Sequence, residues 1–350
     1  MNSDLMEIEE FDDFNNHKFV SCFSDEKFKL HGFIAIHRGN CKVPAFGATR
    51  IVNYPNTRTA LVDALRLSKT MSEKAALAGL HCGGGKAVII SDGKIKDRAG
   101  FLKSYADKVN LLAGHFITGA DVGISKDDVK IMRKLSRFFV GVKADPVRYT
   151  GLGLVVSLRQ SLKRVFGSGK IRGKSIAIQG VGKIGAEFLS RVYPFTKKIY
   201  IADIDIEKIN ILKSKYLGIT VVDSGEIDKL KVDIFSPCAL SNCLNRENVN
   251  KLKCSIVVGG ANCQLESIAI GKKLHNNGIL YAPDYLINAG GLISVYDEYE
   301  FGNTRVRRVT KRVRKIKRTL NRVFEISDKK NVPPFIAANS LAEEIFEKII

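Results

Sequence analysis

The stretch SIAIQGVGKIG, residues 175–185, decides the fold because it joins a short apolar segment to a glycine-rich turn. The turn fits the pattern G-x-G-x-x-G, and a helical pattern, KIGAEFLSRVY, follows at once. In such a turn Gly180 would permit the tight bend, Gly182 would let a pyrophosphate approach the backbone, and Gly185 would allow close helix packing. The alternative is a glycine-rich turn without a ligand. We favour a dinucleotide-binding turn made of Gly180, Val181, Gly182, Lys183, Ile184 and Gly185.

An acidic residue lies where such a turn selects its cofactor. Asp203 follows Gly185 by 18 residues, near the end of the apolar stretch KIYIADID, residues 198–205. A carboxylate at this place can accept hydrogen bonds from the adenosine ribose and repel a 2′-phosphate. The sequence therefore predicts NAD rather than NADP as the cofactor.

The remainder of the second half repeats the order strand, turn, helix. Apolar segments of strand length occur at 233–240, 255–263 and 279–286, at spacings that fit βαβ units. The expected fold class is α/β, with a Rossmann-type doubly wound parallel sheet in this half. The first 140 residues mix short apolar runs with helical patterns, and a chain of 350 residues is long enough for two domains.

A run of three glycines before a lysine stands out in the first half, at Gly83-Gly84-Gly85-Lys86. Ala87 follows, so the pattern lacks the Ser or Thr that an ATP-binding phosphate loop requires. We expect the glycines to let the backbone approach a ligand and Lys86 to project from the start of a strand into a cleft. Burial near other cations lowers a lysine pKa toward ~7–8, which suits a general base. Lys74, 12 residues earlier, is either a second cation in this cleft or a surface residue.

Asp121 lies among small residues in TGADVG, 118–123, after an apolar segment. We expect it where a strand passes into a loop. A buried aspartate that faces a lysine forms a proton-transfer pair. The alternative for Asp121 is an Asx-turn, in which the carboxylate only binds its own backbone.

The chain is basic, with 56 Lys and Arg against 36 Asp and Glu and a formal net charge of +20. Ten of the cations and no acid fall between Thr304 and Val323. Six apolar residues in this run have helical spacing and predict one amphipathic helix: Val306, Val309, Val313, Ile316, Leu320 and Val323. The cations then form either the solvated face of that helix or a contact for a polyanion such as nucleic acid. The run contains no aromatic residue to stack on bases, which favours the solvated face.

Composition excludes several classes of protein. Hydrophobic residues make up 45% and charged residues 26% of the chain, as in ordinary globular domains rather than disordered or collagen-like ones. Seven scattered cysteines without a CxxC pair argue against a disulfide framework and against a metal site. No apolar run reaches the ~18 residues of a membrane span, and the acidic start does not resemble a signal peptide. We expect a cytoplasmic protein.

Six motifs, in order, make the chain similar to the glutamate/leucine/phenylalanine/valine family of amino acid dehydrogenases, and most of all to its leucine dehydrogenase branch. They are PAFGATR (44–50), AGLHCGGGKAVI (78–89), TGADVG (118–123), DIFSPCAL (233–240), GANCQL (260–265) and YAPDYLINAGG (281–291). The resemblance extends from about residue 44 to the end of the chain. It implies oxidative deamination of an L-amino acid to its 2-oxo acid and ammonia, with NAD reduced.

The resemblance also implies roles for single residues. Lys74 matches the lysine that binds the substrate α-carboxylate, and Lys86 the catalytic lysine that activates water. Asp121 matches the aspartate that handles protons at the amino nitrogen. Further positions of the family's substrate and cofactor sites fall on Gly47, Thr150, Cys238, Ala239 and Asn262.

Specificity for the amino acid side chain is expected at a few apolar positions. Glutamate-specific members carry a lysine where this chain has Phe46, so glutamate is disfavoured. Leu292 and Val295 are the other expected pocket walls. Gly119 stands where leucine enzymes usually carry Ala and the phenylalanine branch carries Gly, whereas Phe46 would narrow the pocket. We expect leucine, valine or isoleucine, with phenylalanine as the alternative, because one methylene changes binding by only ~1–3 kcal/mol.

By this resemblance residues 1–145 would form a substrate-binding and oligomerisation domain and 146–325 the NAD-binding domain. A C-terminal helical segment, 326–350, would return to the first domain. The resemblance implies a homo-oligomer, although the basic run at 304–323 would repel its copies across a symmetric interface. The alternative of another class is a non-catalytic member that binds a polyanion through this run.

Overall fold

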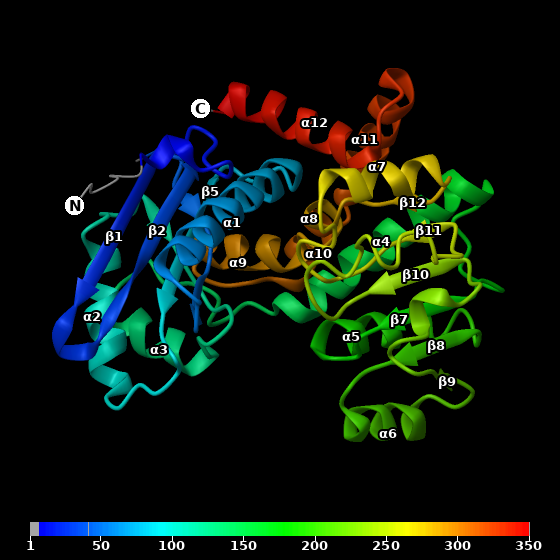
Figure 1. Ribbon diagram of the computed structural model, residues 1–350, viewed down its shortest axis with the longest axis horizontal. Coiled ribbons are helices and arrows are strands. Elements are labelled where there is room, and N and C mark those ends of the chain that lie inside the picture. The colour runs from blue at the N-terminus through cyan, green and yellow to red at the C-terminus, as the bar shows by residue number, and fades with distance from the viewer. Residues whose placement is uncertain (1–6, 41, 350) are drawn as a thin grey trace. The chain divides into compact units, whose positions relative to one another are not determined.

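The computed structural model describes residues 7–40 and 42–349, and the chain divides into two compact units (Figure 1). The first unit comprises Met1–Ala144, Glu298–Asn303 and Ala342–Ile350, and the second comprises Asp145–Asp297 and Thr304–Leu341. Residues 326–341 therefore group with the second unit. The sequence analysis had placed them in a C-terminal segment, 326–350, that returns to the first domain. The assignment of a function to each part of the chain stays a prediction.

The first unit is built on a mixed six-stranded sheet in the order β1-β2-β5-β3-β6, with β4 also paired to β5. Strands β1, β2 and β5 are antiparallel neighbours, whereas β3 and β4 run parallel to β5 and β6 runs parallel to β3. The strands are β1 (Phe19–Asp25), β2 (Leu30–Arg38), β3 (Ala45–Phe46), β4 (Thr49–Val52), β5 (Gly83–Ile90) and β6 (Phe116–Ile117). The helices are α1 (Thr57–Leu77), α2 (Arg98–Asn110) and α3 (Lys126–Leu135), with short 3-10 turns at Ile8–Glu10 and Glu26–Phe28.

The three glycines lie inside β5, which is buried along nearly its whole length, so the expectation that Lys86 begins a strand is wrong. A Cβ on Gly84 would lie 2.0 Å from the backbone nitrogen of Ser72 in α1. A Cβ on Gly83 would lie 1.7 Å from the carbonyl oxygen of Arg38 in β2. Both distances are far below van der Waals contact, so the glycines allow helix and strands to pack at backbone distance.

The second unit contains the doubly wound sheet that the sequence predicted. All six strands are parallel, in the order β12-β11-β10-β7-β8-β9 (Figure 1). They are β7 (Ile176–Gln179), β8 (Ile199–Ala202), β9 (Thr220–Val221), β10 (Ile234–Pro237), β11 (Ile256–Val257) and β12 (Leu280–Tyr281). In chain order within the unit this is 3-2-1-4-5-6, and the order reverses between β7 and β10. Ligands of such sheets bind at this reversal, beyond the carboxyl ends of the strands.

Helices complete the second unit and continue into the first. They are α4 (Pro146–Phe166), α5 (Lys183–Val192), α6 (Ile206–Lys215), α7 (Ile268–Asn276), α8 (Asp284–Ile287), α9 (Gly290–Phe301), α10 (Val306–Val313), α11 (Ile316–Lys330) and α12 (Pro334–Ile349), with a 3-10 turn at Ile227–Lys229. α4 begins where its sequence favours a start, because Asp145 accepts a hydrogen bond from the backbone of Arg148 and Pro146 occupies the first turn. Within the described residues, no helix has the length and apolar character needed to cross a membrane.

The basic run forms two helices, so the single helix expected over 304–323 is wrong. α10 ends at Val313, a two-residue turn follows, and α11 begins at Ile316. Five of the six apolar residues of the expected stripe are buried, whereas Val306, the first residue of α10, is 54% exposed. The turn contains neither Gly nor Pro, so no sequence signal marks the break.

Candidate active site

Lys86 and Asp121 form a buried ion pair in the first unit. Lys86 projects from β5 with only 6% of its side chain exposed, and its Nζ donates to Oδ2 of Asp121. Asp121 lies in the loop after β6, as the sequence predicted. The Thr49 backbone nitrogen of β4 donates to the Gly119 carbonyl at 3.0 Å, which holds this loop beside the sheet. The structure thus brings together the two residues expected to exchange protons.

A third charged residue, which the sequence analysis missed, is bound to the same carboxylate. Arg50 lies on β4, and its Nε donates to Oδ2 of Asp121 at 3.0 Å. The other side of the Arg50 guanidinium contacts Asp63 of α1. The Asp63 Oδ2 accepts hydrogen bonds from Arg50 Nη1 at 3.0 Å and from the Tyr54 hydroxyl at 2.6 Å. Arg50 is the last residue of the PAFGATR motif, so only its place in that motif could have indicated it.

Burial and neighbouring charges lower the pKa values of both residues of the pair. Burial lowers the pKa of Lys86 below its ordinary value; Asp121 opposes this shift and the charge of Arg50 adds to it. Burial alone would raise the pKa of Asp121, but Lys86 and Arg50 outweigh it and hold that pKa well below its usual range. Asp121 is therefore a stable carboxylate beside an amine that loses its proton more easily than a solvated lysine.

The other residues predicted to bind substrate in the first unit lie on neighbouring elements. Lys74 is half-buried in the last turn of α1. Phe46 on β3 is fully buried, and its ring packs edge-on against Tyr299 with the centroids 4.9 Å apart. Gly47 and Gly119 both lie close to a neighbouring backbone. A Cβ on Gly47 would lie 1.9 Å from the Gly85 carbonyl oxygen, and a Cβ on Gly119 would lie 2.8 Å from the Val140 carbonyl oxygen.

The glycine-rich turn of the second unit has the geometry of a dinucleotide site. Gly180 has φ +87° and lies against Ala239, while a Cβ on Gly185 would lie 2.0 Å from the Gly180 carbonyl oxygen. A Cβ on Gly182 would meet nothing within 4 Å, so the space over the turn is open there. Asp203 anchors the turn, because its Oδ2 accepts from the Val181 backbone at 2.7 Å. These features fit a bound pyrophosphate and leave the Asp203 carboxylate at the end of β8 for a ribose.

The remaining predicted cofactor residues gather beyond the same strand ends. Cys238 and Ala239 follow β10, across the reversal of strand order from Gly180. The Thr150 hydroxyl contacts the Asn288 carbonyl at 3.5 Å, and the Asn288 side chain donates to Oδ1 of Asn262 at 3.0 Å. Asn288, from the motif YAPDYLINAGG, was not predicted from the sequence, yet this buried residue contacts Thr150 through its backbone carbonyl and Asn262 through its side-chain amide.

Leu292 and Val295 lie three residues apart on α9 and are therefore on one face of that helix. Both are half-buried in the second unit. Lys183 and Ile184 open α5 directly after Gly182. The structure thus places the predicted residues in two groups, one in each unit.

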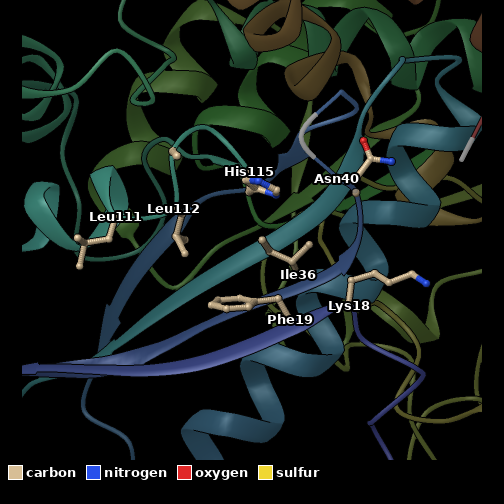
Figure 2. A pocket seen from close by; sticks show the side chains of 9 residues that line it. Lys18, Phe19, Ile36, Asn40, Leu111, Leu112 and His115 are labelled. Atoms are coloured by element: carbon tan, nitrogen blue, oxygen red, sulfur yellow. The ribbon is translucent and has the colours of Figure 1, made fainter.

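A hollow of about 470 Å³ in the first unit lies apart from these residues. Figure 2 shows Phe19 and Ile36 of the β1–β2 pair facing it together with Leu111, Leu112 and His115. None of the residues predicted to bind substrate or cofactor lines this hollow. Its position beside β1, at the edge of the sheet, makes it a surface feature rather than part of the site.

Fold and site together define a two-unit α/β oxidoreductase with a dinucleotide turn in one unit and a lysine–aspartate pair in the other. The chain belongs to the glutamate/leucine/phenylalanine/valine dehydrogenase family: residues 141–349 match the family model of that name, and residues 20–137 match the model of its dimerisation domain. This confirms the resemblance found in the sequence. Enzymes of this family are amino acid dehydrogenases that generally use NAD or NADP.

Relatives of different specificity resemble the chain to similar degrees. L-tryptophan dehydrogenase of Nostoc punctiforme is 39% identical over 90% of this chain and 89% of its own length. Leucine dehydrogenase of Bacillus subtilis is 34% identical over 95% and 92%, and phenylalanine dehydrogenase of Lysinibacillus sphaericus is 35% identical over 95% and 89%. The crystal structure of the Nostoc enzyme matches with a TM-score of 0.83 at 37% identity, covering 95% of this chain and 96% of that one.

Proposed function

We propose that this protein oxidises an apolar L-amino acid to its 2-oxo acid and ammonia with NAD as the oxidant. The observation that carries the proposal is the buried Lys86–Asp121 pair with Arg50 bound to the same carboxylate. One amino acid, one water and one NAD⁺ would yield the 2-oxo acid, ammonium, NADH and one proton. NAD, when bound at the turn 180–185, supplies the chemistry by accepting the hydride from the substrate α-carbon.

The protein's own residues would bind the substrate and move its protons. The Lys74 ammonium would hold the α-carboxylate. Lys86, as the neutral amine, would take a proton from the water that attacks the imino carbon, and as ammonium would stabilise the negative charge that develops on oxygen. Asp121 would accept a proton from the substrate nitrogen and return it to the departing ammonia.

The choice of NAD over NADP is proposed from Asp203. Its carboxylate at the end of β8 would accept hydrogen bonds from a ribose hydroxyl and repel a 2′-phosphate. The carboxylate is fixed for this role, because each oxygen also accepts a backbone N–H, from Val181 at 2.7 Å and from Asp205 at 3.0 Å.

The proposed substrate side chain is aliphatic, with leucine, valine or isoleucine first, because Phe46, Leu292 and Val295 are all apolar and none can bind a charge. An aromatic amino acid is the second candidate. It is supported by the similarity to the tryptophan and phenylalanine dehydrogenases and by Gly119, where even one added carbon would press on a carbonyl.

We also propose that the protein is a homo-oligomer that assembles through its first unit. The family model that matches residues 20–137 describes a dimerisation domain. Strand β1 forms an edge of the sheet, and Phe19 and Leu111 beside it are 38% and 79% exposed. Light scattering on the purified protein tests this, and a monomer at micromolar concentration would contradict it.

The experiment that tests the activity follows NADH absorbance with a panel of L-amino acids that includes leucine, valine, isoleucine, phenylalanine, tryptophan and glutamate. The expected result is NADH formation with at least one apolar amino acid and none with glutamate. The Lys86→Ala variant should lose this activity and still bind NAD. Silence across the panel from a protein that binds NAD would contradict the proposed reaction.

A further inference from the structure

The cations of the basic run fall into sets with different surroundings. Arg308 binds Asp297 in a bidentate pair, with Nε–Oδ1 at 2.6 Å and Nη2–Oδ2 at 2.7 Å, and Arg312 approaches the same carboxylate at 3.5 Å. The Asp297 side chain is completely buried, so these two arginines neutralise a charge of the fold. Arg314 and Lys317, by contrast, are exposed.

These two exposed cations line a hollow together with Arg159 and Lys163 of α4 and Lys170 of the following loop. All five belong to the second unit, and the hollow has a volume of about 560 Å³. The residues come from three segments of the chain, yet among the residues that the structure describes no acidic side chain lines the space they share. We call this space the α4–α11 hollow.

Packing of the two helices fixes the floor of the α4–α11 hollow. Gln160 is almost completely buried there, and its Nε2 donates to Oδ1 of Asn321 on α11 at 2.7 Å. Further along the same helices Arg164 pairs with Asp328. Ile316 and Leu320 of α11 are buried beneath the surface. The backbone around the hollow is therefore held in place, while the charged ends of its side chains stay exposed.

The five cations around the hollow repel one another, which is electrostatically unfavourable unless an anion lies among them. Arg159 and Lys163 are four residues apart on α4, a spacing at which like charges on neighbouring turns of a helix repel, and Arg314 and Lys317 add two more cations to the same hollow. Within residues 7–40 and 42–349 no ion pair joins any of the five cations to an acid, although Arg159 lies 4.8 Å above the Phe195 ring. Arg164, the neighbour of Lys163, has such a partner, so the local sequence does not lack acids altogether.

We propose that the α4–α11 hollow is a binding site for an oligophosphate chain. Five cations around one space call for a ligand with several negative charges at short spacing, and guanidinium and ammonium groups are the usual partners of phosphate oxygens. In the described part of the chain no aromatic residue lines the hollow to stack on a base, so the phosphate chain rather than a base is what the site recognises. A nucleoside triphosphate and free inorganic polyphosphate share this chemistry. The proposal is independent of the dehydrogenase function.

Calorimetry with inorganic triphosphate on the purified full-length protein tests the proposal. The site variant carries Lys163→Gln, Lys170→Gln and Arg314→Gln. The matched control carries Lys213→Gln, Lys251→Gln and Lys272→Gln, three exposed lysines of the same unit outside the hollow, so both variants lose the same net charge. Circular dichroism establishes that both are folded.

We expect saturable binding with one triphosphate per chain and a Kd below about 1 mM at low salt. The site variant should bind about tenfold or more weakly, whereas the control should stay within about twofold of the unchanged protein, because distant charges are screened by solvent and salt. Equal losses in the two variants would show attraction by the overall charge of +20 and would overturn the proposal. Absence of saturable binding would overturn it as well.

ATP, measured in parallel, distinguishes the sources of the phosphate chain. Only the part of ATP binding that the site variant removes is assigned to the α4–α11 hollow, because the adenosine of ATP can also enter the dinucleotide turn. If the hollow binds ATP with the same affinity as triphosphate, the site takes a free phosphate chain. If the hollow binds ATP more tightly than triphosphate, the ligand is a nucleotide. Both results support the proposal.

Discussion

The dinucleotide turn of the second unit and the Lys86–Asp121 pair of the first are built by different physical means. The turn depends on backbone shape: Gly180 has positive φ and Gly185 lies against a carbonyl oxygen. The pair depends on buried charges, since Arg50 contacts Asp121 at 3.0 Å and is itself held by Asp63 at 3.0 Å. The dinucleotide turn, which the backbone shapes, is therefore sensitive to added side-chain volume. The Lys86–Asp121 pair, which charges shape, is sensitive to side-chain protonation.

The largest effect is expected from removing one charge of the pair. Asp121→Asn keeps the shape of the side chain but ends its proton exchange, so kcat should fall about 100- to 10,000-fold, the usual contribution of a positioned acid or base. The dinucleotide turn lies in the other unit, so NAD binding should be unchanged. Steady-state kinetics and fluorescence titration with NADH measure the two quantities.

Asp127→Asn is the matched control for this variant, because Asp127 pairs with Lys130 on the exposed surface of α3. Exposed pairs contribute little to stability or activity, so this control should behave like the unchanged protein. A kcat within threefold of normal, roughly half a power of ten, in Asp121→Asn would refute the assignment of proton transfer to the pair.

A smaller and pH-dependent effect is expected at Arg50. The charge of Arg50 helps to lower the pKa of Lys86, so Arg50→Gln should raise that pKa. A higher pKa leaves less neutral Lys86 at neutral pH, so kcat/KM there should fall about tenfold. Activity should recover at alkaline pH, because the rising limb of the pH profile moves to higher pH.

Arg50→Lys keeps the positive charge and should restore most of the pH profile, although it cannot contact Asp121 and Asp63 in the same two-sided way. If Arg50 were merely structural, Arg50→Gln would lower kcat/KM equally at every pH. That result, from a pH–rate profile of the three proteins, would remove Arg50 from the electrostatics of the site.

The backbone site should respond to volume instead. A Cβ on Gly182 meets nothing in the protein, so Gly182→Ala should leave the melting temperature unchanged. The added methyl group would occupy the space proposed for the pyrophosphate and raise KM for NAD roughly fivefold. Gly180→Ala is the contrasting variant, because its Cβ would lie 2.7 Å from Ala239 at positive φ and should lower the melting temperature as well. Equal KM values for Gly182→Ala and the unchanged protein would place the pyrophosphate elsewhere.

The sequence predicted the backbone site better than the charged one, for a physical reason. The role of glycine in a turn follows from local geometry, so the turn at residues 180–185 and the doubly wound parallel sheet around it could be predicted. The charged site unites β4, β5, α1 and the loop after β6, and its second layer, Asp63 and Tyr54, bears no local signal. The triple glycine was misjudged for a related reason, because its close neighbours, Arg38 of β2 and Ser72 of α1, lie on elements that precede it in the chain.

A buried histidine gives the first unit a further dependence on protonation, with the smallest effect. His17 is buried against α1, where its Nε2 donates to the Leu65 carbonyl at 3.1 Å and its Nδ1 accepts from the Asn15 backbone at 3.2 Å. Burial lowers the pKa of His17 from 6.5 to about 4. Between these values the unfolded chain binds a proton that the folded chain excludes, so stability falls as pH drops from 6.5 toward 4.

Native-state hydrogen exchange of the α1 amides, corrected for the intrinsic rate, measures this loss. Between pH 7 and pH 5 the His17→Gln variant should lose about 2 kcal/mol less opening free energy than the unchanged protein. His115→Gln, which changes an exposed histidine of the same unit, should show the unchanged protein's dependence. If His17→Gln loses protection as steeply as His115→Gln, the acid sensitivity of the first unit originates in other groups, and the contrast with the backbone-built site rests on Lys86, Asp121 and Arg50 alone.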